Sequence, residues 1–324
     1  MKKQLFYDEY KMARRTRKFI SITKLHGWII AFVTSVMQLR PVQGLWRCIF
    51  GRPIALINVM NSKMYVDLSD PGVSRQLITR GRREVEHLND IRRHLRPGMT
   101  GIDIGANIGY FALIEAALIG PTGRLYCMEP VPENIELLHR NVKINGLTDV
   151  IHIFQNAVAA KKEILRIALT TASYSHHVLA KNNELSGLQR YMKVAGVSID
   201  DFMDSQGLRT DDINFLRCDI EGYEVIAFKG MTKILESKSP LHLFIELHPD
   251  AYPCWGADIS DVVELLVKSG FRFRRVIKEF VSPDGKEPKV EILTSPSPEE
   301  YLLRQSRWPV GGIQVYLERV GAIS

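Results

Sequence analysis

Short apolar runs alternate with amphipathic stretches from about residue 98 onward, and this alternation predicts strands and helices taking turns. The predicted strands cover 100–104, 124–128, 151–154, 164–168, 213–218, 241–246, 271–277 and 312–318. The predicted helices cover 110–118, 132–145, 224–235 and 259–269. This order is typical of an α/β, Rossmann-like fold with a doubly wound, mostly parallel sheet, and we expect its last strand to be antiparallel.

The chain ahead of this alternation has a different pattern. Residues 5–50 are predicted to be mainly helical, and 54–67 form two short strands around the turn Asn61-Ser62. Helices are predicted over 71–79 and 84–95. We therefore divide the chain into an N-terminal helical extension, residues 1–53, and one α/β domain, residues 54–324, whose core covers 98–280.

Positive charge is concentrated in the extension. The chain carries a net charge of +7, but residues 1–52 alone carry +9, from eleven Lys and Arg against Asp8 and Glu9, which leaves −2 for the remainder. A basic segment favours an anionic partner such as lipid headgroups or nucleic acid. Because the remainder is slightly acidic, we do not expect nucleic acid to be the partner of the domain.

An apolar stretch within the extension, residues 19–39, is interrupted by Lys24 and His26 and is too short to span a bilayer. It predicts either a helix packed on the domain or peripheral contact with an anionic membrane. Four cysteines without a pairing or zinc-binding pattern favour a reducing compartment. We expect a cytoplasmic protein, with the inner face of the membrane as a possible location.

A glycine-containing turn, DIGANIGY over 103–110, follows the first core strand and precedes a helix. Gly105 lets the backbone turn tightly near a ligand, and Gly109 permits close packing of the helix. Asp103 places a carboxylate where it can hold a ligand's ammonium group. Asn107 takes the place of the middle glycine of a dinucleotide fingerprint, and no P-loop lysine is present, so the pattern favours a zwitterionic amino-acid tail over a pyrophosphate.

A second carboxylate, Glu129, ends the next strand, 26 residues after Asp103. An acid at this place in a Rossmann-like fold accepts hydrogen bonds from both ribose hydroxyls. The turn, the strand-end acid and the intervening helix together predict a site for an amino-acid nucleoside.

Further polar residues follow two later strands. Asp219 and Glu221 come after 213–218, while Glu246 ends 241–246 and His248 follows it. If these strands are neighbours, the four side chains form one candidate catalytic group, with His248 as general base. Three of them, Asp219, Glu246 and His248, also suit a divalent ion, while Glu221 alternatively caps the following helix. The sequence does not decide between these roles, and the need for a metal stays open.

Three segments, DIGANIGYFAL, MEPVPENIELLHRNVKING and FLRCDIEGYEVIAFKGM, resemble the FkbM-type family of class I S-adenosylmethionine-dependent methyltransferases. The resemblance covers roughly residues 81–246 and does not include the first 50. It implies S-adenosylmethionine as cofactor. It also implies that the methionine moiety is contacted by Asp103, Gly105, Asn107 and Gly109. The resemblance places Glu129 at the ribose, and Asn156 and Ala157 beside the adenine. Asp219 would face the methyl-transfer site.

The family also points to O-methylation of a small molecule or a saccharide, by analogy. In the expected reaction a hydroxyl oxygen displaces the sulfonium methyl, Asp219 organises the site and His248 takes the proton. Two alternatives stay open: a methyltransferase acting on RNA or protein, and a membrane-associated scaffold of the same fold that has lost catalysis.

Overall fold

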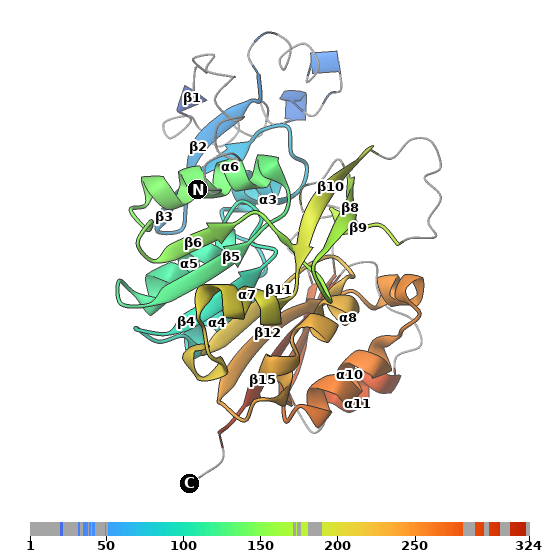
Figure 1. The fold of residues 1–324 in the computed structure, drawn as a ribbon. Coiled ribbons are helices and arrows are strands. Elements are labelled where there is room, and N and C mark those ends of the chain that lie inside the picture. The colour runs from blue at the N-terminus through green and yellow to red at the C-terminus, as the bar shows by residue number, and fades with distance from the viewer. Residues whose placement is uncertain are drawn as a thin grey trace, which may run out of the picture.

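An eight-stranded sheet forms the centre of the computed structural model, among the residues that the structure describes (Figure 1). These are residues 20–21, a few positions between 32 and 49, and 51–170, 173, 176–180, 190–280, 289–294, 298–304 and 312–321. The strands lie in the order β14 (Lys289–Leu293), β13 (Arg272–Phe280), β15 (Ile313–Arg319), β12 (Leu241–Leu247), β11 (Phe215–Cys218), β4 (Thr100–Ile104), β5 (Arg124–Met128) and β6 (Ile151–Phe154).

The five strands from β12 to β6 pair in parallel. The last strand, β15, inserts between β12 and β13 and is antiparallel to both. The sheet therefore confirms the predicted α/β class and the antiparallel last strand. Because β4 and β11 are neighbours, the carboxyl ends of strands more than 100 residues apart in the chain meet at one edge.

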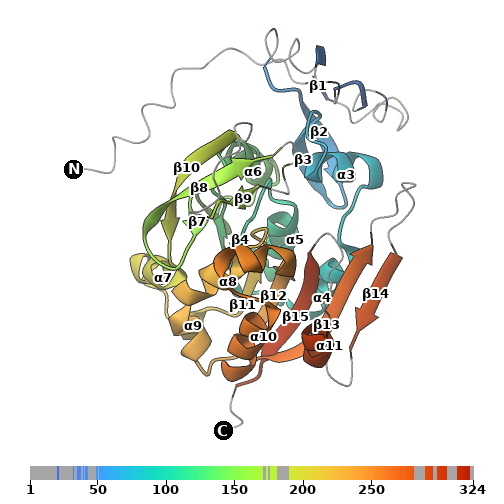
Figure 2. The same ribbon diagram turned by 90° about the vertical axis from the view of Figure 1, so that its right-hand side faces the viewer.

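Helices cover both faces of this sheet (Figure 2). One face packs against α4 (Val85–His94), α5 (Tyr110–Ile119) and α6 (Pro132–Ile144). The other packs against α7 (Ile199–Gln206), α8 (Glu224–Ala227), α9 (Thr232–Glu236), α10 (Ile259–Lys268) and α11 (Pro298–Arg304). Each face carries an apolar cluster; Cys127 belongs to the first and Cys218 to the second, so both are core residues.

The strand predicted over 164–168 exists, but it lies in a second sheet. This sheet has the order β7 (Ala157–Val158), β10 (Arg190–Val197), β8 (Glu163–Leu169) and β9 (His177–Val178). The strand β10 was not predicted from the sequence. Its exposed and buried positions alternate and include Arg190, Lys193 and a glycine, so it lacks an obvious apolar run. The helix predicted over 224–235 is also divided, by a 3-10 turn at Phe228–Gly230, into α8 and α9.

A hairpin precedes the core, as predicted, with strands β2 (Ile54–Val59) and β3 (Ser62–Asp67) followed by α3 (Val73–Arg80). Most of the extension over 1–53 lies outside the described residues, so its helical character stays a prediction. Of the few described positions, 32, 35–37, 41–42 and 49 are helical, whereas Ile20–Ser21 forms a short strand, β1, parallel to β2. Among the described residues, no helix is both long and apolar enough to cross a membrane.

Candidate active site

A cavity of about 880 Å³, its open mouth included, lies at the carboxyl ends of β4, β5 and β11. The loops after these strands and after β6 line it. Of the candidate residues, the lining includes Gly105, Asn107, Glu129, Asn156, Ala157, Asp219 and Glu221. The tertiary structure thus brings together side chains from four separate strand ends, which is where an open α/β sheet places its ligand.

The turn after β4 depends on Gly105. Its φ is +85°, and a Cβ there would lie 1.9 Å from the backbone oxygen of Asp219, at the end of the neighbouring strand. The amides of Gly105 and Ala106 both donate to the carbonyl of Met128, at 2.9 and 3.1 Å. The turn is therefore held against both adjacent strands, and only glycine fits this close approach.

Substituting Gly105 by alanine is expected to lower the free energy of unfolding by at least about 2 kcal/mol, because the clash is with backbone and the conformation is left-handed. Gly146→Ala is the matched control. Its φ is +68° and no atom lies within 4 Å of the added Cβ, so only the conformational cost of about 1 kcal/mol applies. Urea denaturation of both variants measures the difference, and equal losses would contradict the proposed contact.

Gly109 has a packing role rather than a place in the cavity lining. A Cβ at this residue would lie 2.6 Å from Cδ1 of Leu138 in α6. Gly109 was predicted to permit close packing of the helix that follows it. Close packing is present, and the neighbouring element is helix α6. Gly109 therefore brings α5 and α6 together beside the cavity. Its position does not favour direct contact with the methionine moiety.

Glu129 lies at the cavity with both carboxylate oxygens held in place. Oε2 accepts a hydrogen bond from the amide of Asn107 at 2.9 Å, and Oε1 accepts from the amide of Val131 at 2.9 Å and from Nδ2 of Asn134 at 3.2 Å. Burial raises the pKa of Glu129 to about 7, although these three donors act in the opposite direction. A fixed acceptor at the strand end is the geometry that a ribose diol requires.

Asp103 occupies a different place from the one predicted. Its side chain is fully buried in β4, outside the cavity lining, and Oδ1 accepts a hydrogen bond from Nη1 of Arg217 at 3.1 Å. The expectation that Asp103 holds a ligand's ammonium group directly is therefore corrected. A buried guanidinium needs a carboxylate partner, and Asp103 is the register partner of Arg217 on the adjacent strand.

Arg217 is the principal residue that the sequence analysis missed. Its guanidinium, 3% exposed, lies 4.0 Å from the ring centroid of Phe111. Nη1 bonds to Asp103, and Nη2 donates to Oδ2 of Asp219 at 3.0 Å. An arginine inside the apolar run FLRC was the available signal, because a charge in a buried strand requires partners. Arg217 thus connects the turn after β4 to the end of β11.

A cluster of acids surrounds His248 at the ends of β11 and β12, which are neighbours as expected. Nδ1 of His248 lies 3.0 Å from Oε1 of Glu224, and Nε2 lies 3.5 Å from Oε2 of Glu221 and 3.9 Å from Oε1 of Glu246. Glu221 does not cap α8, whose N-terminus lacks a side-chain cap. We call Asp219, Glu221, Glu246 and His248 the acid–histidine cluster.

The electrostatics of this cluster bear on the predicted role of His248. Burial alone would lower its pKa, but the facing carboxylates of Glu224, Glu221 and Glu246 raise the pKa well above its usual value. Burial and neighbouring acids raise the pKa of Glu221 to about 8 and that of Glu246 well above its usual range. With these neighbours His248 holds a proton at neutral pH, so the geometry does not favour it as the general base.

Two aromatic residues just past His248 lie outside the cavity lining. Tyr252 is fully buried, and Trp255 makes an edge-to-face contact with Tyr223 at a centroid distance of 4.9 Å. His176, in the loop after β8, lines the cavity.

The sheet order and the cavity at the ends of the parallel strands define a Rossmann-like, nucleoside-binding α/β protein. Residues 103–273 match the family described as the methyltransferase FkbM domain, over more than half of the chain. The chain therefore belongs to the FkbM methyltransferase family. This match confirms the expected S-adenosylmethionine-dependent methyltransferase domain.

Local similarity extends to other methyltransferases. The chain is 41% identical over 49 residues to protein-L-isoaspartate O-methyltransferase of Methanothrix thermoacetophila, covering 15% of this chain and 23% of that protein. It is 32% identical over 79 residues to the enzyme of the same name from Methanococcoides burtonii, covering 24% and 39%. The matched segments thus span between a quarter and two fifths of these relatives' length.

Solved structures with a similar arrangement include M. jannaschii TYW2 in complex with AdoMet, at 12% identity and a TM-score of 0.43, covering 83% of this chain and 88% of that one. A putative rRNA-methylase from Clostridium thermocellum aligns at 12% identity and a TM-score of 0.40, covering 73% and 95%.

Proposed function

We propose that this protein transfers the methyl group of S-adenosylmethionine to a hydroxyl oxygen of a small molecule or a saccharide. One observation carries the proposal: a single cavity is lined by Glu129 on one side and by Asp219 and Glu221 on the other. Glu129 is suited to bind a nucleoside. Asp219 and Glu221 place hydrogen-bond acceptors where a hydroxyl nucleophile would need them.

The residues around the cavity fit the cofactor. Glu129 would hold the ribose, because its oxygens are fixed by three N–H donors and one of the roughly four acceptor sites of a carboxylate, on Oε2, is left for a ribose hydroxyl. Asn156 and Ala157 would border the adenine, and the turn at Gly105 and Asn107 would adjoin the methionine moiety. When bound, S-adenosylmethionine supplies a methyl group on a cationic sulfur.

In the proposed transfer, the acceptor oxygen forms a bond to the methyl carbon while the carbon–sulfur bond breaks. The bonding electron pair stays on sulfur, and the hydroxyl proton passes to a carboxylate of the acid–histidine cluster. The protein's contribution is to align the oxygen and exclude water, since methyl transfer needs little covalent assistance. Within the cluster, the carboxylate of Asp219 takes the place of His248 as proton acceptor, because the pKa values of His248, Glu221 and Glu246 are all raised.

The net charge of the domain favours a neutral acceptor over RNA. Asp219 and Glu221 line the cavity together with Arg83 and Arg217, and the chain beyond residue 52 carries a net charge of −2. A polyanion would be repelled there unless the basic extension supplied the attraction. An inactive scaffold would have no physical need for the fixed carboxylate of Glu129 at the cavity.

Incubation of the full chain with methyl-labelled S-adenosylmethionine and fractions of a cell extract tests this proposal. Label is expected in the small-molecule or saccharide fraction, and base-stable label at an ether oxygen identifies O-methylation. Label that disappears with ribonuclease or protease treatment would indicate RNA or protein methylation. Calorimetry without heat on addition of S-adenosylmethionine would favour the scaffold.

Cofactor affinity is expected to depend on pH through Glu129. The ionised carboxylate keeps an acceptor site for a ribose hydroxyl beside its three N–H donors, and protonation removes acceptor capacity, so affinity should rise as pH increases through about 7 and weaken, by up to roughly tenfold per pH unit, below it. Glu129→Ala should weaken binding by about 1–3 kcal/mol at pH 8.

Calorimetric titration of S-adenosylhomocysteine between pH 6 and 8 measures this dependence. Glu129→Gln is the matched control, because a side chain that does not ionise should give a flatter profile. A native profile as flat as that of the variant, or unchanged affinity in Glu129→Ala, would remove Glu129 from the ribose site.

A further inference from the structure

Three side chains of the acid–histidine cluster converge beside the cofactor cavity. One ligand atom each of Asp219, Glu221 and His248 lies within 4.8 Å of the others. Asp219 and Glu221 come from the loop after β11, and His248 follows the end of β12. Two carboxylate oxygens and an imidazole nitrogen in this arrangement offer one face of a metal coordination sphere.

The imidazole is oriented as in a metal site. Its Nδ1 lies 3.0 Å from Oε1 of Glu224, a side chain with no exposed surface, which also accepts the amide hydrogen of Gly222 at 3.1 Å. A carboxylate on one ring nitrogen directs the other toward the ligand, and such carboxylate–histidine pairs are typical behind metal ligands. Nε2 therefore faces Glu221 and Glu246.

An oxygen of Asp219 is available in the same place. Oδ2 is engaged by Arg217, whereas the buried Oδ1 has no hydrogen-bond partner among the described residues. A buried carboxylate oxygen without a donor costs free energy, and a cation would remove this cost. The side chain is held by Arg217, so its free oxygen keeps its orientation.

Charge also accumulates around this point. Besides Asp219 and Glu221, the carboxylates of Glu224 and Glu246 lie close to His248. Arg217 pairs with Asp219, and Arg83 acts on Glu221. A divalent cation would offset this excess of negative charge.

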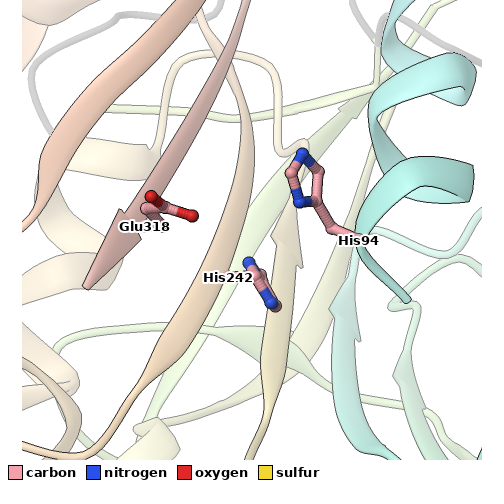
Figure 3. Close-up of side chains that lie close together, drawn as sticks. All are labelled: His94, His242 and Glu318. Carbon is pink, nitrogen blue, oxygen red and sulfur yellow. The ribbon is translucent and has the colours of Figure 1, made fainter. Parts of the chain in front are cut away.

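A second cluster of histidines and a carboxylate differs from this one, because its polar groups already have hydrogen-bond partners. His94, His242 and Glu318 face a common space where α4, β12 and β15 come together (Figure 3). The hydroxyl of Tyr316 already lies 3.1 Å from Nδ1 of His94, 3.0 Å from Nδ1 of His242 and 2.9 Å from Oε2 of Glu318, and Arg274 pairs with the other oxygen of Glu318. These groups satisfy one another, so this cluster serves as an internal control.

We propose that Asp219, Glu221 and His248 bind a divalent cation of the Mg²⁺ and Mn²⁺ class at the acceptor side of the cavity. The cation would displace the proton from Nε2 of His248, because a metal ligand must be deprotonated. Binding of the cation rests on the cluster alone, whereas its role rests on the proposed function. There the cation would position the acceptor hydroxyl next to the methyl group and lower the pKa of that hydroxyl, so that the proton leaves more readily.

Titration of the EDTA-treated full chain with Mn²⁺, followed through the EPR signal of the free ion, tests the site. We expect about one bound ion per chain. Glu221→Gln and Asp219→Asn should each weaken binding by more than about tenfold, since a ligand is lost. His94→Ala is the matched control and should leave Mn²⁺ affinity unchanged. Circular dichroism checks that each variant is folded, and titration with S-adenosylhomocysteine checks the cofactor half.

The outcomes separate the two proposals. A native chain that binds S-adenosylhomocysteine but not Mn²⁺ overturns the metal site and leaves the methyltransferase proposal in place. A chain that binds Mn²⁺ with the expected variant effects but not S-adenosylhomocysteine supports the metal site and contradicts the proposed function. Loss of Mn²⁺ binding in His94→Ala, with binding intact in Glu221→Gln, would also overturn the assignment.

Discussion

Replacement of Arg217 by methionine is expected to lower the free energy of unfolding by about 3–5 kcal/mol, because it leaves a buried carboxylate without a counter-charge. Asp103 is fully buried, and its only hydrogen bond from a side chain in the described part of the chain comes from Arg217. The variant also loses the contact between the guanidinium and Phe111. Urea denaturation at neutral pH measures the loss.

A double variant and a pH titration identify the cause of that loss, and an exposed ion pair provides the control. Adding Asp103→Asn to Arg217→Met should recover part of the stability, since the unpaired charge is removed. Burial raises the pKa of Asp103, so the single variant should regain stability as pH falls and this carboxyl takes up a proton. Arg209→Met, at an exposed pair with Asp212, should not measurably change the transition. An Arg217→Met protein as stable as the native one would contradict the buried-network interpretation.

Asp219→Asn is expected to lower kcat by roughly 10²–10⁴-fold, with a smaller change in affinity for S-adenosylmethionine. The substitution keeps the shape of the side chain and an oxygen for Arg217. It replaces Oδ1, which has no hydrogen-bond partner among the described residues, by an NH₂ group that donates instead of accepting. Steady-state kinetics on the acceptor found by the labelling experiment, together with calorimetry, separate the two effects.

Asp204→Asn provides the control for this experiment. Asp204 lies on α7 and pairs with Lys233 at the surface, away from the cavity lining, so kcat should not change. If Asp219→Asn retained native kcat, Asp219 would have no part in the transfer. If it lost cofactor affinity in proportion to kcat, its role would be in binding S-adenosylmethionine.

Much of the fold could be predicted because the signals are local. Strands β4, β5 and β6 and the helices α5 and α10 agree with the apolar periodicity to within a residue or two. The turn at Gly105 and the acid at Glu129 were recognisable from strand, glycine and helix in sequence. The strand β10 was missed because its residues alternate in exposure without an apolar run.

Side-chain partners could not be predicted, because they depend on the register between distant strands. Asp103 and Arg217 are 114 positions apart in the chain and directly opposite in the sheet. A carboxylate at a turn looks accessible from the sequence, and only the neighbouring strand reveals that it is buried against a guanidinium.

The Rossmann-like fold could be predicted from the apolar periodicity, and the methyltransferase domain from the resemblance of three short motifs, since both depend on neighbours along the chain. Only the folded chain shows which acids line the cavity, that Asp103 is buried, and that the carboxylates around His248 raise its pKa. The reason is physical: burial and charge at a site are set by groups that folding brings together from separate strand ends.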